Sequence, residues 1–225
     1  PFSASSLRKI LRQNLEGSKV EQGKRVLVVA SRNRHKVEEI RAILRDLPFE
    51  VVSIADLGDF PEVVEDGETF AENARKKAMQ TMEWVRELVV ADDSGLEVDA
   101  LQGAPGVRSA RFAAPPGESS TDAANNAKLL QLLAHVPPEN RGAQFRCVMA
   151  LAVPGGDVHF AEGICRGIIG FEPRGDQGFG YDPLFIVPEL GKTFAELGPE
   201  VKNRIGHRAR ALAGLKQLLK GYQNP

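Results

Sequence analysis

Apolar runs bounded by polar or turn-forming residues predict several β-strands along the chain. They lie at residues 25–30, 49–54, 88–91, 145–153 and 158–171. The first run, RVLVVA, is almost entirely apolar and rich in β-branched residues, which is typical of a strand buried on both faces. We therefore expect it in the middle of a sheet. The last two runs flank Gly155 and Gly156, so we expect them to pair through a tight turn.

Apolar residues spaced three or four positions apart predict helices between and after these strands. The expected helices cover residues 36–47, 69–85, 122–133 and 207–219. Pro48 ends the first, and Thr69 with Glu72 gives the second the spacing of a capping box. The segment before the last helix is dense in Gly, Asp and Pro and is expected to be a loop. Strands that alternate with helices indicate an α/β fold.

Length and composition describe an ordinary folded protein. A chain of 225 residues fits one large α/β domain as well as two small lobes, and 42% hydrophobic with 26% charged residues is near the globular average. Residues 1–23 are rich in Ser, Lys, Arg and Gln. We interpret them as an N-terminal extension with a short helix around residues 7–15, and we expect residues 24–225 to form the functional domain.

Charge balance, apolar runs and cysteine spacing argue against several classes of partner and indicate a cellular location. With 29 basic and 30 acidic side chains the net charge is -1, which gives no long-range field to attract a polyanion such as DNA. No apolar run approaches the length of a membrane span, and no secretion signal is visible. Cys147 and Cys165 lack the spacing of a metal or redox motif, as in reduced cytosolic proteins. We expect a cytoplasmic protein without nucleic-acid or membrane partners.

The polar segment 31–36 follows the first strand and leads into a helix. Backbone N–H groups, a hydroxyl, an amide and an ammonium group can converge there on phosphate oxygens. The segment therefore predicts a phosphate site. The alternative is that Ser31 or Asn33 only caps the helix while the basic side chains are solvated.

Two adjacent carboxylates, Asp92 and Asp93, follow the apolar run 88–91, where we expect the strand to end. Ligand-binding side chains of α/β proteins are commonly presented at such a position. Because Mg²⁺ binds a few carboxylates together with water and phosphate oxygens, Asp93 with the distant Glu65 would suit it. The alternative is a turn in which Asp92 and Ser94 bond their own backbone.

The segment GFGYDP, residues 178–183, places two aromatic residues among residues that permit tight turns. A ring with free backbone donors beside it can stack on a base and contact the edge of that base. Lys202 and the segment Gly206-His207-Arg208 at the start of the last helix add cationic and hydrogen-bonding groups. The alternatives are aromatic residues that fill the core and a solvated helix start.

In combination and in this order, the segments resemble the inosine triphosphate pyrophosphatase family, also called the Ham1 or RdgB-type proteins. The motifs are SRNRHKVEEI, EDGETFAENARKKA, ADDSGLEVDALQGAPGVRSARF, GFGYDPLF followed by GKTFAEL, and KNRIGHRARAL. The resemblance covers residues from about Val26 to Leu219. It implies an elongated two-lobed α/β structure with a long mixed sheet flanked by helices and an active-site cleft between the lobes. It also implies a homodimer.

The resemblance further implies a Mg²⁺-dependent hydrolase that cleanses the nucleotide pool. Such an enzyme converts noncanonical purine nucleoside triphosphates (ITP, dITP and XTP) to the monophosphate and pyrophosphate. Glu65 and Asp93 would be the Mg²⁺ ligands, and Asp93 would also position or deprotonate the attacking water, with Asp92 and Lys77 in support. The triphosphate contacts would come from Ser31, Asn33, Lys36 and Lys77.

The purine base would be bound by the later motifs. By the same resemblance Phe179 would stack on the base, and the substrate-binding residues would also include Ser94, Gly180, Tyr181, Asp182, Lys202, His207 and Arg208. A pocket that offers donors to the 6-oxo group of hypoxanthine or xanthine would place a donor against the 6-amino group of adenine. Adenine would then be rejected, because two donors cannot bond each other.

Two positions depart from the family pattern, and two other functions remain in view. Arg32 stands where many relatives have Gly, so it either adds a phosphate contact or points to solvent. Gly206 stands where many have Ser, which leaves the purine preference open.

A Maf-like nucleotide pyrophosphatase of other specificity is disfavoured by the GFGYDP and GHR segments. A non-catalytic nucleotide-binding regulator is disfavoured because Glu65 and Asp93 are both present.

Overall fold

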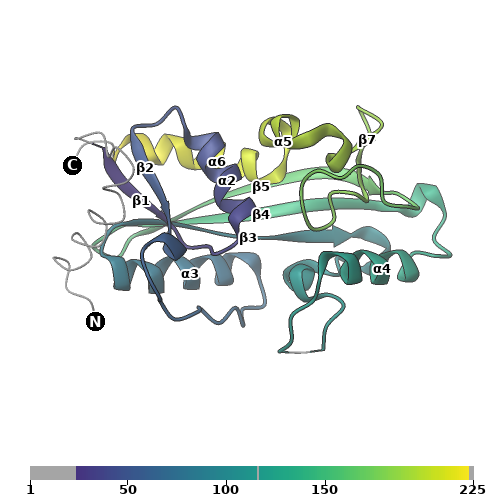
Figure 1. Ribbon diagram of the computed structural model, residues 1–225, viewed down its shortest axis with the longest axis horizontal. Coiled ribbons are helices and arrows are strands. Elements are labelled where there is room, and N and C mark those ends of the chain that lie inside the picture. Colours follow the sequence, from purple (N-terminus) through teal and green to yellow (C-terminus); the bar gives the residue numbers. More distant parts are fainter. Residues whose placement is uncertain (1–23, 116, 223–225) are drawn as a thin grey trace. The chain divides into compact units, whose positions relative to one another are not determined.

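The computed structural model describes residues 24–115 and 117–222 (Figure 1). These residues form two compact units. Unit 1 contains residues 24–93, 148–162 and 211–222, and unit 2 contains residues 94–115, 117–147 and 163–210. The helix expected around residues 7–15 lies outside the described residues. No helix in the described part of the chain is long and apolar enough to cross a membrane.

A seven-stranded mixed sheet with flanking helices makes this an α/β fold, as predicted. The strands stand in the order β2-β1-β3-β4-β5-β6-β7. β1 is parallel to β2 and β3, whereas β6 is antiparallel to β5 and β7. The bounds are β1 Arg25–Val29, β2 Phe49–Ser53, β3 Leu88–Val98, β4 Gly142–Ala152, β5 Val158–Ile169, β6 Phe185–Val187 and β7 Lys192–Thr193.

The helices expected from the apolar spacing are present, with small shifts at their ends, and α5 is an additional helix that the spacing did not predict. The bounds are α2 Arg34–Leu44, α3 Phe70–Val85, α4 Asp122–Leu132, α5 Phe194–Ile205 and α6 His207–Lys220. Short 3₁₀ helices are η1 Ile54–Asp56, η2 Asp99–Leu101, η3 Gly106–Arg111 and η4 Pro138–Asn140. The helix expected at 36–47 begins two residues earlier, because Asn33 caps it, and ends at Leu44.

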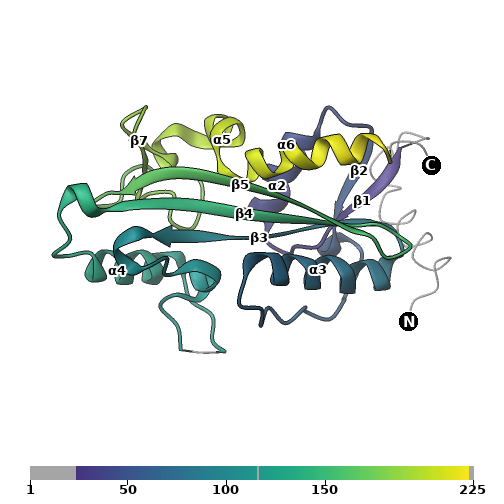
Figure 2. The same cartoon turned by 180° about the vertical axis from the view of Figure 1, so that it is seen from behind.

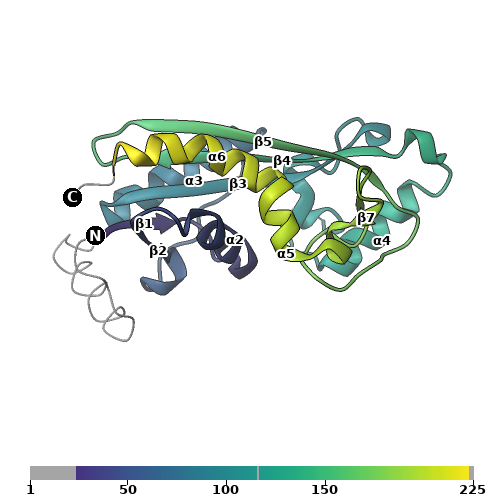
Figure 3. The same ribbon diagram turned by 90° about the horizontal axis from the view of Figure 1, so that it is seen from above.

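In unit 1, α3 covers one face of the strands, and α2 with the C-terminal part of α6 covers the other (Figures 1, 2 and 3). β1 lies between β2 and β3. Its residues Leu27, Val28 and Val29 have no exposed surface, which confirms the prediction of an inner strand buried on both faces. The capping box of α3 is also confirmed, because Thr69 and Glu72 each accept the backbone N–H of the other.

In unit 2, aromatic rings pack at the centre of the core. The ring centroids of Phe145 and Phe185 are 4.5 Å apart, and those of Phe185 and Phe194 are 5.3 Å apart. Leu129 and Leu133 at the end of α4 join the same cluster and are fully buried. The helix that contributes them is therefore fixed to the ring cluster by apolar packing.

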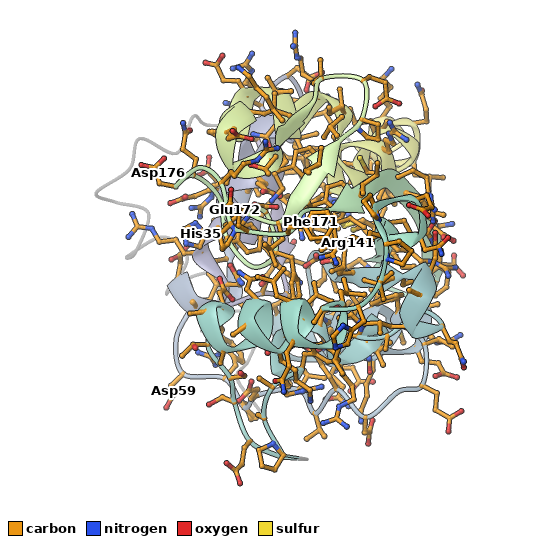
Figure 4. All side chains as sticks on the ribbon, turned by 90° about the vertical axis from the view of Figure 1, so that its right-hand side faces the viewer. His35, Asp59, Arg141, Phe171, Glu172 and Asp176 are labelled. Carbon is orange, nitrogen blue, oxygen red and sulfur yellow. The ribbon has the colours of Figure 1, made fainter. Side chains whose placement is uncertain are left out.

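Arg141 is a buried cation that ties the end of α4 to the end of β5. Its guanidinium donates to the carbonyl oxygens of Leu133 at 2.7 Å, Ile169 at 2.9 Å and Gly170 at 2.7 Å. The ring of Phe171 lies over it, with 4.2 Å from the guanidinium carbon to the ring centroid (Figure 4). Burial lowers the pKa of Arg141. A cation at the carboxyl end of a helix is favoured by the helix dipole.

Two predictions about strands and loops are wrong. The strand expected to end at Ala91 continues as β3 through Asp92 and Asp93 to Val98. The segment expected to be a loop contains β6, β7 and the helix α5. Gly198 and Pro199 interrupt the helical pattern of α5, where Gly198 has a positive φ of 77° and marks a kink. A capping box from Thr193 and Glu196 nevertheless starts this helix.

Candidate active site

Asp92 and Asp93 lie inside β3 and point to opposite faces of the sheet, as successive strand residues do. On one face, the Nζ of Lys36 from α2 lies 3.2 Å from Oδ2 of Asp92. On the other, the Nζ of Lys77 from α3 lies 3.2 Å from Oδ1 of Asp93. Both carboxylates are buried, with 1% and 5% of their surface exposed. Each acid therefore has its own lysine, which explains how the strand can continue past two adjacent charges.

Lys77 also contacts the third acid of this region. Its Nζ lies 3.1 Å from Oε1 of Glu65, so one ammonium group faces two carboxylates. Asn73 donates from Nδ2 to Oδ2 of Asp93 at 3.0 Å. The sequence pattern gave Asn73 no role, although its spacing of four from Lys77 places both on one helix face. Lys36, Glu65, Lys77, Asp92 and Asp93, all in unit 1, are called the charged cluster below.

Burial and charge act against each other in the charged cluster. Burial acts to lower the pKa of Lys77, but the negative charges of Asp93 and Glu65 outweigh it and raise this pKa. Lys77 is therefore a cation at neutral pH. Burial raises the pKa of the Asp93 carboxyl, and the positive charges of Lys77 and Lys36 oppose this only in part. A raised pKa makes a carboxylate a better proton acceptor than an ordinary one.

The segment before α2 is held by hydrogen bonds at several points. Asn33 caps the helix, because its Oδ1 accepts the Lys36 N–H at 3.2 Å. The Oγ of Ser31 accepts the Asn33 N–H at 3.2 Å, and the Ser31 carbonyl accepts the Ser53 hydroxyl at 2.8 Å. Arg32 does not point only to solvent, because its guanidinium donates to the carbonyl of Phe60. Capping by Asn33 is thus confirmed, and a phosphate role for this segment stays a prediction.

In unit 2, a buried ion pair supports the ring of Phe179. The Nζ of Lys202 in α5 lies 2.6 Å from Oδ2 of Asp182, and the two residues are only 5% and 1% exposed. The same ammonium nitrogen lies 4.3 Å from the centroid of the Phe179 ring, within cation–π range. Asp182 also accepts the Phe179 N–H at 3.0 Å. The ion pair and the ring therefore form one connected arrangement.

Of the first two residues of α6, Arg208 joins this arrangement and His207 packs on a ring of the unit 2 core. The imidazole of buried His207 stacks on Phe145, with 4.7 Å between ring centroids and 19° between planes. The guanidinium of buried Arg208 donates to the Ser94 hydroxyl at 3.0 Å, and its carbon lies 6.0 Å from the centroid of the Phe179 ring. We call Phe179, Asp182, Lys202, His207 and Arg208, all in unit 2, the aromatic cluster.

Gly180 and Tyr181 make contacts that the sequence did not suggest. The Tyr181 hydroxyl donates to the carbonyl of Ser109 at 2.8 Å, and its ring is buried in the core. Burial, helped by the charge of Asp122, raises the pKa of Tyr181 and keeps the hydroxyl neutral. The Gly180 N–H donates to Asp122. Contacts of Gly180 and Tyr181 with a substrate stay predictions. In this structure the Gly180 N–H and the Tyr181 hydroxyl are both already hydrogen-bonded within the protein.

A family model for the Ham1 family matches residues 27–218, nearly all of the described chain. The chain belongs to the Ham1 family. It is 56% identical over 193 residues to the dITP/XTP pyrophosphatase of Desulforamulus reducens, which covers 86% of this chain and 94% of that protein. It is 55% identical over 197 residues to the dITP/XTP pyrophosphatase of Geobacter sulfurreducens, which covers 88% and 97%.

Solved structures of Ham1 proteins are also similar to this fold. The Staphylococcus aureus Ham1 protein has a TM-score of 0.75 at 40% identity, covering 88% of this chain and 99% of that one. The Ham1 protein from Coxiella burnetii has a TM-score of 0.75 at 39% identity, covering 87% and 98%. The α/β fold with its mixed sheet is thus that of the Ham1 family.

The donor set of the charged cluster fits a magnesium ion. Across residues 24–115 and 117–222, no group of three or more His, Cys, Asp or Glu side chains is arranged to hold a metal ion. Glu65 and Asp93 nevertheless face one cation, the ammonium group of Lys77. Mg²⁺ is commonly bound by one or two carboxylates plus waters and phosphate oxygens rather than by an all-protein cage. By donor type, two carboxylates meet that requirement.

Proposed function

We propose that this Ham1 protein hydrolyses aberrant purine nucleoside triphosphates, ITP, dITP and XTP, to the monophosphate and pyrophosphate. The observation that carries the proposal is the charged cluster, in which two lysines and three acids are grouped around β3. Relatives at 55% identity and above are dITP/XTP pyrophosphatases. A triphosphate needs positive charge for its oxygens, and a hydrolase needs a proton acceptor for water. The cluster contains both.

Glu65 and Asp93 would hold Mg²⁺ in this proposal. The bound ion would neutralise phosphate charge, which makes pyrophosphate a better leaving group. Lys77 now contacts both carboxylates, so metal binding would free its ammonium group for phosphate oxygens. Lys36 would likewise exchange Asp92 for a phosphate oxygen. Ser31 and Asn33 lie just before α2 and would add hydrogen bonds to the triphosphate.

Asp93 would position and deprotonate the attacking water. The water oxygen forms a bond to the α-phosphorus, the bond from that phosphorus to the bridging oxygen breaks, and pyrophosphate leaves with the bond electrons. The proton of the water passes to the Asp93 carboxylate. The hydrogen bond from Asn73 fixes the orientation of this carboxylate. No covalent bond to the protein is needed.

The aromatic cluster would bind the base and sugar. The ring of Phe179 would stack on the purine, which is favourable for every base. Lys202 and Arg208 lie against the same ring and can donate hydrogen bonds to acceptors on the base or sugar. A donor aimed at the 6-oxo group would favour hypoxanthine and xanthine over adenine. Asp182 holds Lys202 in place through their ion pair, and Ser94 accepts a hydrogen bond from Arg208.

A panel of nucleoside triphosphates tests the proposal. Purified protein is incubated with ITP, dITP, XTP, GTP and ATP, with and without Mg²⁺, and pyrophosphate and orthophosphate are measured separately. We expect pyrophosphate with no orthophosphate, a kcat/KM highest for ITP, dITP and XTP, and no turnover after chelation. Orthophosphate as the product, or equal rates for ATP and ITP, would contradict the proposal.

A further inference from the structure

The backbone of Gly180 is held at both of its polar groups by one turn of α4. Its N–H donates to Oδ2 of Asp122 at 2.6 Å, and its carbonyl accepts Nδ2 of Asn126 at 3.0 Å. Asp122 and Asn126 are four residues apart, so their side chains lie on the same face of the helix. The two hydrogen bonds span 58 and 54 residues of sequence. They join α4 to the segment that contains Phe179.

The peptide that is held in this way has an uncommon conformation. Gly180 has φ 61°, in the left-handed region where residues other than glycine are strained. Because a glycine can adopt many conformations, hydrogen bonds from its surroundings help to keep it in one. The N–H of Phe179 itself donates a hydrogen bond to the Asp182 carboxylate. The backbone is therefore fixed on both sides of the ring, by Asp182 at Phe179 itself and by α4 at Gly180.

Asp122 is not needed to cap α4. Thr121 is the N-cap, and its hydroxyl accepts the Ala124 N–H at 3.1 Å. An acid in the first turn of a helix is favoured by the helix dipole wherever it points. The Asp122 carboxylate nevertheless reaches across to Gly180 in a short, charge-assisted hydrogen bond. Asn126 has no capping role either, because it lies one turn farther along the helix.

We infer that Asp122 and Asn126 are positioning residues that set the place of the Phe179 ring and thereby the affinity for the base. The inference rests on the proposed function, in which Phe179 stacks on a purine. A ring on a fixed backbone loses less conformational entropy on binding than a ring on a mobile loop. Removing either side chain leaves the charged cluster in unit 1 unchanged. The base should then bind more weakly while the phosphate chain binds as before.

The test compares two inhibitors that each represent one half of the substrate. Inosine has the base without phosphates, and inorganic tripolyphosphate has the phosphates without a base. Their inhibition constants are measured against ITP hydrolysis for the wild type, Asp122→Ala, Asn126→Ala and Asp122→Asn. We expect Asp122→Ala and Asn126→Ala to raise the constant for inosine about five- to tenfold and to leave that for tripolyphosphate unchanged. Asp122→Asn keeps an acceptor oxygen and should recover part of the loss.

Thr121→Ala is the matched control, because it weakens the start of α4 without touching Gly180. It should lower the melting temperature and leave both inhibition constants unchanged. The inference is overturned if Asp122→Ala and Asn126→Ala leave inosine inhibition unchanged. It is equally overturned if Thr121→Ala weakens inosine binding as much as they do, since helix stability would then explain the effect.

A separate measurement distinguishes failure of this inference from failure of the proposed function. Absence of ITP hydrolysis by the wild type would defeat the proposed function. Calorimetric titration of the same variants with inosine would still test the positioning role, because it needs no turnover. A weaker inosine affinity in Asp122→Ala and Asn126→Ala, but not in Thr121→Ala, supports the inference in that experiment also. Equal affinities in all variants overturn it.

Discussion

The charged cluster of unit 1 and the aromatic cluster of unit 2 both contain buried charges, but they are built differently. In the charged cluster one lysine faces two acids, so its ammonium group keeps one carboxylate partner if the other turns to a different cation. In the aromatic cluster the Lys202 ammonium lies between Asp182 and the ring of Phe179, and packing fixes its place. The first arrangement suits chemistry with exchange of partners. The second suits recognition by a surface formed in advance.

The largest loss of activity with the smallest loss of stability is expected for Asp93→Asn in the charged cluster. The substitution removes the proposed proton acceptor and one metal ligand, so kcat should fall by about 10³-fold. Stability should change little, since Lys77 keeps Glu65 as a partner. Turnover of ITP and urea denaturation are measured on the same preparation. Asp46→Asn, which affects only a surface ion pair with Lys216, is the control and should keep full activity. A folded Asp93→Asn protein with normal turnover would contradict the assignment.

For the ion pair of the aromatic cluster, by contrast, we expect a substitution to lower stability. Asp182→Asn removes the charge that faces buried Lys202, so the free energy of unfolding should fall by about 3 kcal/mol. Adding Lys202→Met should restore part of the loss, because no buried charge is then unpaired. Urea denaturation of the two single variants and the double variant measures this coupling. Strictly additive losses would mean that the pair does not act as a unit.

Much of unit 1 could be predicted because its signals are local. The apolar run of β1 and the capping box at Thr69 and Glu72 each depend on a few adjacent residues. The continuation of β3 could not be predicted, since it depends on lysines from α2 and α3 that neutralise Asp92 and Asp93. The elongated shape, the cleft and the homodimer implied by the family resemblance stay predictions, and so does the cytoplasmic location inferred from the cysteines and the apolar runs.

The sequence indicated candidate site residues but not the contacts between them. The sequence indicated Asp93 and Phe179, because charged and aromatic residues beside turn-forming residues are chemically conspicuous, and the family resemblance added Lys77. Asn73 was passed over because a polar residue on a helix is usually solvated, and only the fold turns it toward Asp93. Asp122 lies 58 residues from Gly180, and no local pattern can indicate such a hydrogen bond.

A smaller effect, on inhibition constants, should distinguish residues that contact the phosphates from residues that contact the base. Lys36→Ala removes a cation beside Asp92, so tripolyphosphate inhibition should weaken by about tenfold while inosine inhibition stays the same. Lys76→Ala is the matched control. Lys76 pairs with exposed Asp66 on the surface, so its loss should move neither inhibition constant. Equal losses for both inhibitors in Lys36→Ala would place Lys36 away from the phosphates.

The smallest effect, and the one that tests the aromatic cluster most directly, is a change in substrate preference. Phe179→Ala should lower kcat/KM for ITP, XTP, GTP and ATP alike, because stacking is worth roughly 1–3 kcal/mol per base and tolerates base identity. Arg208→Ala should instead narrow the gap between ITP and ATP, by about tenfold or less, since a donor at the 6-oxo edge discriminates only where that edge differs. Ser94→Ala, which removes the hydroxyl that accepts a hydrogen bond from Arg208, should narrow the gap between ITP and ATP to a smaller extent.

The outcome that would contradict this role is an equal loss of all four kcat/KM values in Arg208→Ala. The guanidinium would then only support the Phe179 ring, whose centroid lies 6.0 Å from the guanidinium carbon. Discrimination would then have to come from Lys202 or from backbone donors in unit 2.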